Sequence, residues 1–214
     1  MATYNDLLNS AQVAIDSALS NPEIQVFLTP FGYPPEELQH GRTLYEAAIA
    51  AFQKQKENYA DQFGASATLD QLREDVNKTY IRQVKLARIA FKDDPVATAK
   101  LALTGERKRS FTGWLGQVQQ FYAALAGDKR LQQGLARFGV TPKTIEQDQA
   151  QIQLVMEANV ARETEKGEAQ QSTKDRDSAL DDLLEWHSDF VAIARIALEE
   201  KPQLLETLGI LIAS

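Results

Sequence analysis

The stretch FGYPPEELQHG at residues 31–41 returns as FGVTPKTIEQD at residues 138–148, 107 positions later. A second block, LARIAFKDDP at 86–95, aligns at the same offset with IARIALEEKP at 193–202. The alignment needs no gap, and twice 107 is the full length of 214 residues. The sequence therefore predicts a tandem duplication of one unit, which occupies half of the chain each time.

The repeated motif predicts a corner between two helices. Each glycine is expected to end a helix in the left-handed conformation, and the phenylalanine before it is expected to stay in the apolar core. Each proline is expected at the first position of the next helix, where its missing N–H is not needed. The six positions are Phe31, Gly32, Pro35, Phe138, Gly139 and Pro142.

Apolar residues spaced three and four apart predict helices throughout the first unit, and no strand is expected. The first helix is expected to be capped by Thr3. A long helix is expected over 35–63, and GASATLDQL at 64–72 predicts a turn because Thr68 has the position of an N-cap. The chain would then return as an antiparallel helix over 69–91, which makes a helical hairpin.

The second unit repeats this plan, with long helices expected over 142–169 and 176–199. Between them, ARETEKGEAQQSTKDRDS at 161–178 is almost entirely polar. The stretch has little to bury, so it is expected to form the exposed far end of the second hairpin, where it is either a solvated surface or a binding tip.

These patterns together predict an all-α protein, in which two helical units pack as a pseudo-two-fold bundle. The units are residues 1–107 and residues 108–214, and they form either two domains or one cooperative domain.

Composition restricts the functional class. The chain carries 30 Asp and Glu against 23 Lys and Arg, a net charge of −7, which disfavours a general nucleic-acid binder. The two sequence halves share this excess, with −3 in residues 1–107 and −4 in the remainder. Cysteine is absent, which excludes disulfides and thiolate sites. Without a secretion signal or a long apolar run, the chain is expected to be soluble and cytoplasmic, with no membrane partner.

Glu37 and His40 form the one Glu-x-x-His pattern, the spacing that places two metal ligands one helical turn apart. The duplicate position carries neither ligand. Glu37 also lies in a first helical turn, where a carboxylate is expected for capping. The pair is therefore a metal candidate whose favoured interpretation is structural, and no cofactor is expected.

Arg88 and Arg195 recur in register inside the apolar ARIA block. They are either anion anchors or structural arginines whose guanidinium binds an acid or the carbonyls at a helix end. Arg107, Lys108 and Arg109 form the basic cluster between the repeats. The cluster is either a solvated linker or a phosphate-binding patch.

No nucleophile elbow or catalytic triad is evident, so enzymatic activity is not expected. The sequence favours a structural or protein-interaction module that engages an unidentified protein or associates with itself. The alternative is a helical bundle that binds a small molecule or metal between the repeats.

Overall fold

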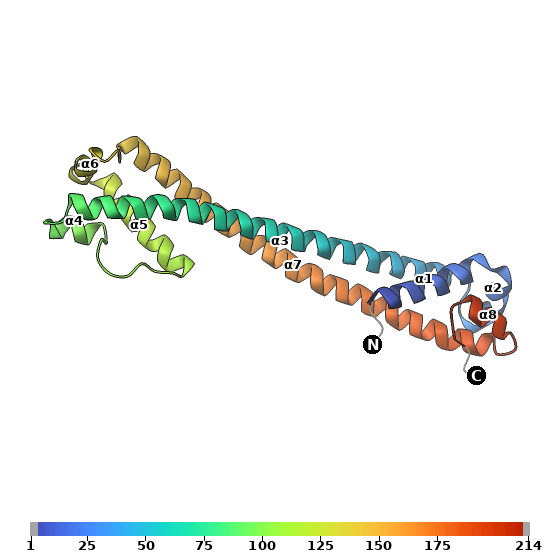
Figure 1. The fold of residues 1–214 in the computed structure, drawn as a ribbon. Helices are drawn as coiled ribbons and strands as arrows, with labels where there is room; N and C mark the ends of the chain where they lie inside the picture. Colours follow the sequence, from blue (N-terminus) through green and yellow to red (C-terminus); the bar gives the residue numbers. More distant parts are fainter. Residues whose placement is uncertain (1–3, 212–214) are drawn as a thin grey trace. The chain divides into compact units, whose positions relative to one another are not determined.

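The computed structural model describes residues 4–211 and is all-helical, with no strand in that range, which confirms the predicted fold class (Figure 1). The cap expected at Thr3 lies outside the described residues. The elements are α1 (Tyr4–Ser20), α2 (Pro22–Leu28), the 3-10 turn η1 (Thr29–Phe31), α3 (Pro35–Ala90), α4 (Pro95–Lys100), α5 (Phe111–Gly127), α6 (Lys129–Ala136), α7 (Pro142–Ala197) and α8 (Pro202–Thr207).

Helix boundaries follow the repeat offset of the sequence. Helices α5, α7 and α8 begin and end at the positions that α1, α3 and α4 predict when they are shifted by that offset, and α6 begins where α2 predicts. The order of helices in residues 1–107 thus recurs in residues 108–214.

The hairpins expected from the sequence are wrong, because α3 and α7 are each one continuous helix of 56 residues. Thr68 does not cap a new helix. Its hydroxyl donates to the Gly64 carbonyl at 2.9 Å, inside the helix. A glycine within a helix costs about 1 kcal/mol, which is too little to end a long helix without a proline.

The polar stretch 161–178 lies within α7 and is not the tip of a hairpin. Two of its small side chains are buried, Ala169 at 2% and Ser172 at 4% exposure. Most of its other side chains are exposed, as expected, but the stretch is not the end of a hairpin.

The chain divides into two compact units, and these units do not contain the same residues as the two sequence repeats. Unit 1 contains residues 1–60 and 167–214, and unit 2 contains residues 61–166. Each long helix contributes one segment to each unit. Each unit therefore combines the first helices of one repeat with the last helices of the other.

In unit 1, α1 packs its alanine-rich face into a core that also receives Phe190 and Leu198 from the end of the chain. The side chain of Asn58 donates to the Glu168 carbonyl at 3.3 Å, which ties α3 to α7. In unit 2, Tyr80 from α3 and Phe121 from α5 meet edge to face at 5.5 Å between ring centroids in the core.

The repeated corners have left-handed glycines, with φ of 90° at Gly32 and 80° at Gly139. The amide after Gly32, that of Tyr33, donates to the Leu28 carbonyl, and the second corner makes the equivalent bond. Such bonds satisfy carbonyls that a helix end would leave unpaired. Pro35 and Pro142 are the first residues of α3 and α7.

The two phenylalanines of the corners differ. Phe31 is 46% exposed, so its expected burial is wrong, whereas Phe138 packs half-buried against the core of unit 2. The corner is held by its backbone bonds and does not require a buried phenylalanine.

Within residues 4–211, none of the helices combines the length and the apolar character needed to cross a membrane.

Candidate anion pocket in unit 2

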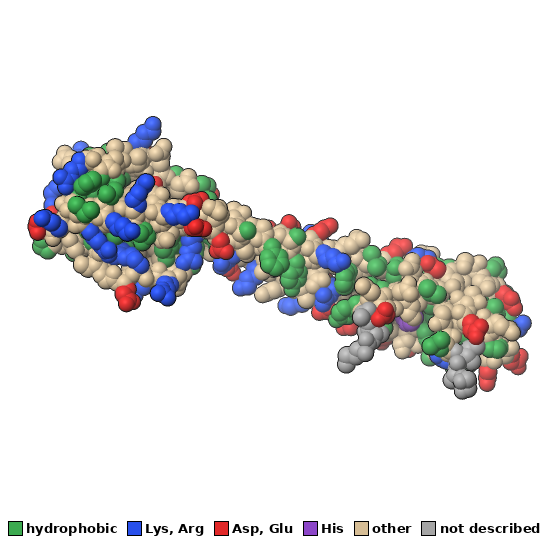
Figure 2. All heavy atoms as spheres, viewed as in Figure 1, with side chains coloured by type: hydrophobic (Ala, Val, Ile, Leu, Met, Phe, Trp, Pro, Cys, Tyr) green, Lys and Arg blue, Asp and Glu red, His purple; other side chains and the backbone are tan. Residues whose placement is uncertain are grey.

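The charges of the chain divide unevenly between the compact units. Unit 2 carries 16 Lys and Arg against 13 Asp and Glu, a net charge of +3. Unit 1 carries 7 against 17, a net charge of −10. Figure 2 shows Lys and Arg side chains gathered over the part that carries α4, α5 and α6. The two sequence halves therefore have similar net charges, whereas one compact unit is basic and the other is strongly acidic.

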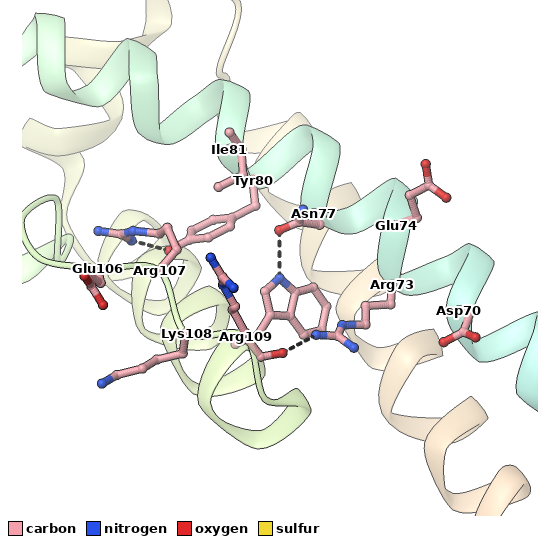
Figure 3. Close-up of a pocket in the computed structure, with 11 residues that line it drawn as sticks. Asp70, Arg73, Glu74, Asn77, Tyr80, Ile81, Glu106, Arg107, Lys108 and Arg109 are labelled. Atoms are coloured by element: carbon pink, nitrogen blue, oxygen red, sulfur yellow. Dashed lines mark hydrogen bonds between the residues drawn. The ribbon is translucent and has the colours of Figure 1, made fainter.

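Unit 2 also contains a cavity with a volume of about 900 Å³. Ligand pockets typically enclose about 300–1,000 Å³. One wall is α3, which contributes Arg73, Asn77 and Tyr80, and the facing wall contains Trp114 of α5 (Figure 3). The third wall is the segment 106–109, which precedes α5.

Hydrogen bonds fasten the 106–109 segment to its surroundings. Arg107 donates from Nη1 to the Tyr80 hydroxyl at 2.6 Å and from Nη2 to the Ala102 carbonyl at 2.6 Å. The backbone amide of Lys108 donates to the Gln117 side chain at 2.9 Å, and the amide group of Gln117 donates back to the Glu106 carbonyl. The segment is therefore held to both α3 and α5.

Arg73 and Trp114 complete the opposite end of the pocket. Arg73 donates from Nη2 to the Arg109 carbonyl at 2.8 Å, and its guanidinium lies 5.2 Å from the centroid of the Trp114 ring. The Trp114 indole N–H donates to the Asn77 side chain at 2.9 Å. Because these groups position one another, the pocket is formed before any ligand arrives.

The basic side chains of the pocket lack carboxylate partners in the described residues. Arg73 and Arg107 bind neutral oxygens, and Lys108 and Arg109 are exposed with no ion pair among residues 4–211. In Figure 3 the Arg109 side chain extends toward Tyr80 of α3. By contrast, Lys100 of the same unit pairs with Asp128 at 2.9 Å.

Three carboxylates also line the pocket: Asp70, Glu74 and Glu106. Glu74 is paired with Lys78, which does not line the pocket, at 2.8 Å. Four basic side chains therefore face two carboxylates that have no such partner, an excess of about two positive charges.

The sequence indicates one side of this pocket. The basic cluster at 107–109 is visible in the sequence, where it has two possible interpretations. The residues of the opposite wall are not recognisable from the sequence. Arg73 and Asn77 lie more than 30 positions from Trp114 along the chain, and each fits the ordinary pattern of its own helix. Their proximity depends on how α3 packs against α5, and no local sequence signal records that.

The metal candidate is not assembled. The Glu37 carboxylate accepts a hydrogen bond from the Trp186 indole N–H at 2.7 Å, and His40 is exposed. Across residues 4–211, no group of three His, Cys, Asp or Glu side chains is arranged to hold a metal ion.

The recurring arginines are both exposed. Arg88 donates from Nε to the Leu103 carbonyl at 2.8 Å, a contact of the structural kind. For Arg195, no side-chain hydrogen bond is found among the described residues. Neither arginine lines the 900 Å³ pocket.

Unit 1 has an aromatic cluster where unit 2 has polar groups. Trp186 stacks on Phe190 at 5.2 Å, and Tyr33 meets both rings edge on. Burial, reinforced by the nearby carboxylates Asp189 and Glu37, raises the pKa of Tyr33. The cluster packs into the core of unit 1.

The equivalent place in unit 2 holds a buried polar network. Gln83 donates from Nε2 to Asp148 at 2.6 Å, and Tyr122 lies beside them. Burial and the Asp148 carboxylate raise the pKa of Tyr122. The repeat offset pairs Gln83 with Phe190 and Tyr122 with Ile15, so these two core positions carry polar groups in unit 2 and apolar side chains in unit 1.

Comparison with known proteins does not assign this chain to a family. No protein-family model matches it, and no curated protein or solved structure is similar to it.

Proposed function

We propose that the protein is a non-enzymatic binding module and that the pocket in unit 2 takes a small molecule. The observation that carries this proposal is the 900 Å³ cavity whose walls are fastened together by hydrogen bonds. Such preorganisation lowers the entropy cost of binding. The chain would act in the reducing cytoplasm, which suits a protein without cysteine.

The composition of the pocket supports binding over catalysis. Its lining, all within the described residues, offers basic, acidic, amide and aromatic groups but no histidine, serine or cysteine. Nucleophilic catalysis usually pairs such a nucleophile with a base. Selective retention of a ligand requires no such pair.

We also propose that the chain arose by tandem duplication with a pseudo-two-fold relation between its repeats. The shared register of the helix boundaries supports this origin. The pocket is lined from both repeats, because Arg107 is the last residue of the first repeat and Lys108 the first of the second. A ligand site at the junction of the repeats agrees with the alternative function expected from the sequence, in which a small molecule binds between the repeats.

A ligand that occupies the pocket is expected to raise the melting temperature of the full chain. A ligand present at 100 times its dissociation constant stabilises the native state by about 2.7 kcal/mol. A screen of common metabolites by thermal shift would find it, with native mass spectrometry to establish one ligand per chain.

The matched variants are Arg109→Ala in the pocket and Arg82→Ala, an exposed arginine of α3 that does not line it. The ligand-induced shift should be lost in the first and kept in the second. Equal shifts in both variants would place the ligand elsewhere and contradict the proposal.

Self-association is the second candidate function, and the opposite charges of the two units favour it. The acidic unit 1 of one molecule would attract the basic unit 2 of another, which makes a head-to-tail contact that can continue into chains. Sedimentation velocity in about 20 mM salt should then show oligomers that dissociate at about 500 mM salt, because salt screens this attraction. A monomer at both salt concentrations would exclude this candidate.

A further inference from the structure

The chemical features of the pocket in unit 2 indicate which class of small molecule it binds. We propose that it binds a single phosphate group, as found on a phosphate monoester, through Arg109 and Lys108 with Arg107 behind them. The inference rests on the proposed binding function of this pocket. The charge of the pocket, its free hydrogen-bond donors and the fixed backbone that carries them support this ligand.

The charge of the pocket suits an anion with one or two negative charges. Its four basic side chains exceed its carboxylates by about two once the Glu74–Lys78 pair is set aside. A phosphate monoester carries about −1.5 to −2 charges at pH 7. A polyanion would bring more negative charge than the lining balances, and it would also meet the carboxylates of Asp70 and Glu106.

Donors are available in the number that a phosphate requires. The Arg109 guanidinium and the Lys108 ammonium make no hydrogen bond within residues 4–211, and together they offer eight N–H groups. In Figure 3 the exposed Lys108 side chain extends away from Arg109, so its contact with a ligand requires a rotation of that side chain. Arg107 adds a further donor, because its Nε is buried without an acceptor in that range. A buried unpaired donor lowers stability, so an acceptor near it is favoured.

The donors are carried by a fixed segment. The backbone of residues 106–109 is bound at the Glu106 and Arg109 carbonyls and at the Lys108 amide. The segment begins after Gly105, which has a left-handed backbone with φ of 81°. Arginine recognises phosphate by paired parallel hydrogen bonds, which need this kind of fixed geometry.

The two tryptophans allow a test with an internal control. Trp114 lies in the pocket and donates to Asn77, whereas Trp186 lies in unit 1 and donates to Glu37. Each indole N–H gives its own signal in a nitrogen-15 correlation spectrum of the full chain. The Trp186→Phe spectrum assigns the two signals.

Titration with inorganic phosphate at constant ionic strength is expected to move the Trp114 signal saturably and to leave the Trp186 signal in place. Acetate, which carries a single charge, should bind at least about tenfold more weakly. Glycerol 3-phosphate should move the signal as phosphate does. Vesicles of phosphatidic acid, with phosphatidylcholine vesicles as reference, test whether the same group is taken from a lipid surface.

The double variant K108Q/R109Q is expected to weaken phosphate binding by about tenfold or more, because two charge-assisted contacts are lost. The control K85Q/K143Q removes two exposed charges of unit 2 outside the pocket and should bind as the native chain does. Both variants change exposed side chains, so their melting temperatures should match.

The outcomes separate the two proposals. If a neutral or cationic metabolite moves the Trp114 signal while phosphate and glycerol 3-phosphate do not, the phosphate inference is overturned and the binding function stands. If no compound moves that signal, both are overturned. Equal weakening in the two double variants would show general charge attraction and would also overturn the phosphate inference.

Discussion

Residues 61–166 expressed alone are expected to fold into unit 2, whereas residues 1–107 are expected to form no stable monomeric domain. Every residue of the unit 2 core lies between Leu69 and Val155, so the excised segment keeps the whole core. Residues 1–107 contain only the part of unit 1 that precedes residue 61. They lack the α7 and α8 residues that close its core, among them Phe190 and Leu205.

Circular dichroism and the dispersion of amide signals would measure the difference. The 61–166 fragment should show a cooperative thermal transition and dispersed signals. The 1–107 fragment should unfold without cooperativity when dilute and should gain structure only with rising concentration, as copies supply each other's missing helices. A cooperative monomer of residues 1–107 would mean that α3 can fold back on itself as the hairpin expected from the sequence.

A chain that joins residues 1–60 to residues 167–214 by a short loop tests the same conclusion from the other side. Asn58 binds the Glu168 carbonyl and Gln55 lies 3.4 Å from the Thr173 hydroxyl, so the two ends are neighbours. This chain should fold as unit 1. Its failure, together with that of the 61–166 fragment, would show that the units depend on each other.

Gly41→Ala is expected to destabilise the protein by about 2–3 kcal/mol, although alanine is the better helix former. A methyl group at Gly41 would overlap the ring of Trp186. The ring cannot move aside freely, because it stacks on Phe190, meets Tyr33 edge on and donates to Glu37. Relief would break one of these contacts.

Gly64→Ala is the matched control in the same helix. A methyl group at Gly64 would meet no atom within 4 Å, so the substitution should stabilise by about 0.5–1 kcal/mol. Urea unfolding followed by circular dichroism gives both changes. A gain in stability for both variants would mean that the Trp186 ring can be displaced at no cost.

The Gly41→Ala variant should also move the indole N–H signal of Trp186, since the ring must shift relative to Glu37. The Trp114 signal in unit 2 should remain in place. Movement of neither signal would contradict the packing of Trp186 on the Gly41 backbone.

Sequence reasoning predicts where the long helices begin, but it predicts neither that each of them continues without a break nor which segments pack together. Pro35 and Pro142 begin the long helices, and Gly32 and Gly139 turn the chain before them, because caps and corners act within one or two helical turns. The turn expected at Gly64 is wrong, because a turn there would depend on contacts between distant segments. A glycine and a threonine in a helix interior cost little, so whether the chain folds back there is decided by the segments available for packing.

The candidate pocket shows the same limit. The cluster Arg107, Lys108 and Arg109 is visible in the sequence, but its interpretation as a phosphate patch cannot be separated there from that of a solvated linker. In the structure Arg73, Tyr80 and Trp114 form the rest of the cavity, which favours the interpretation of the cluster as part of a binding pocket. Only the packing of α3 against α5 brings these residues together.

The sequence by itself determined the all-helical class, the 107-residue offset between its similar stretches and the positions of the corners before the long helices, since each depends on nearby residues. The tertiary structure alone decided that α3 and α7 continue through both compact units, that Gly41 must stay small, and that the charges separate into a net +3 unit and a net −10 unit. These properties depend on which distant segments pack together. That choice follows from the burial of whole helix faces and is not recorded in any short stretch of the chain.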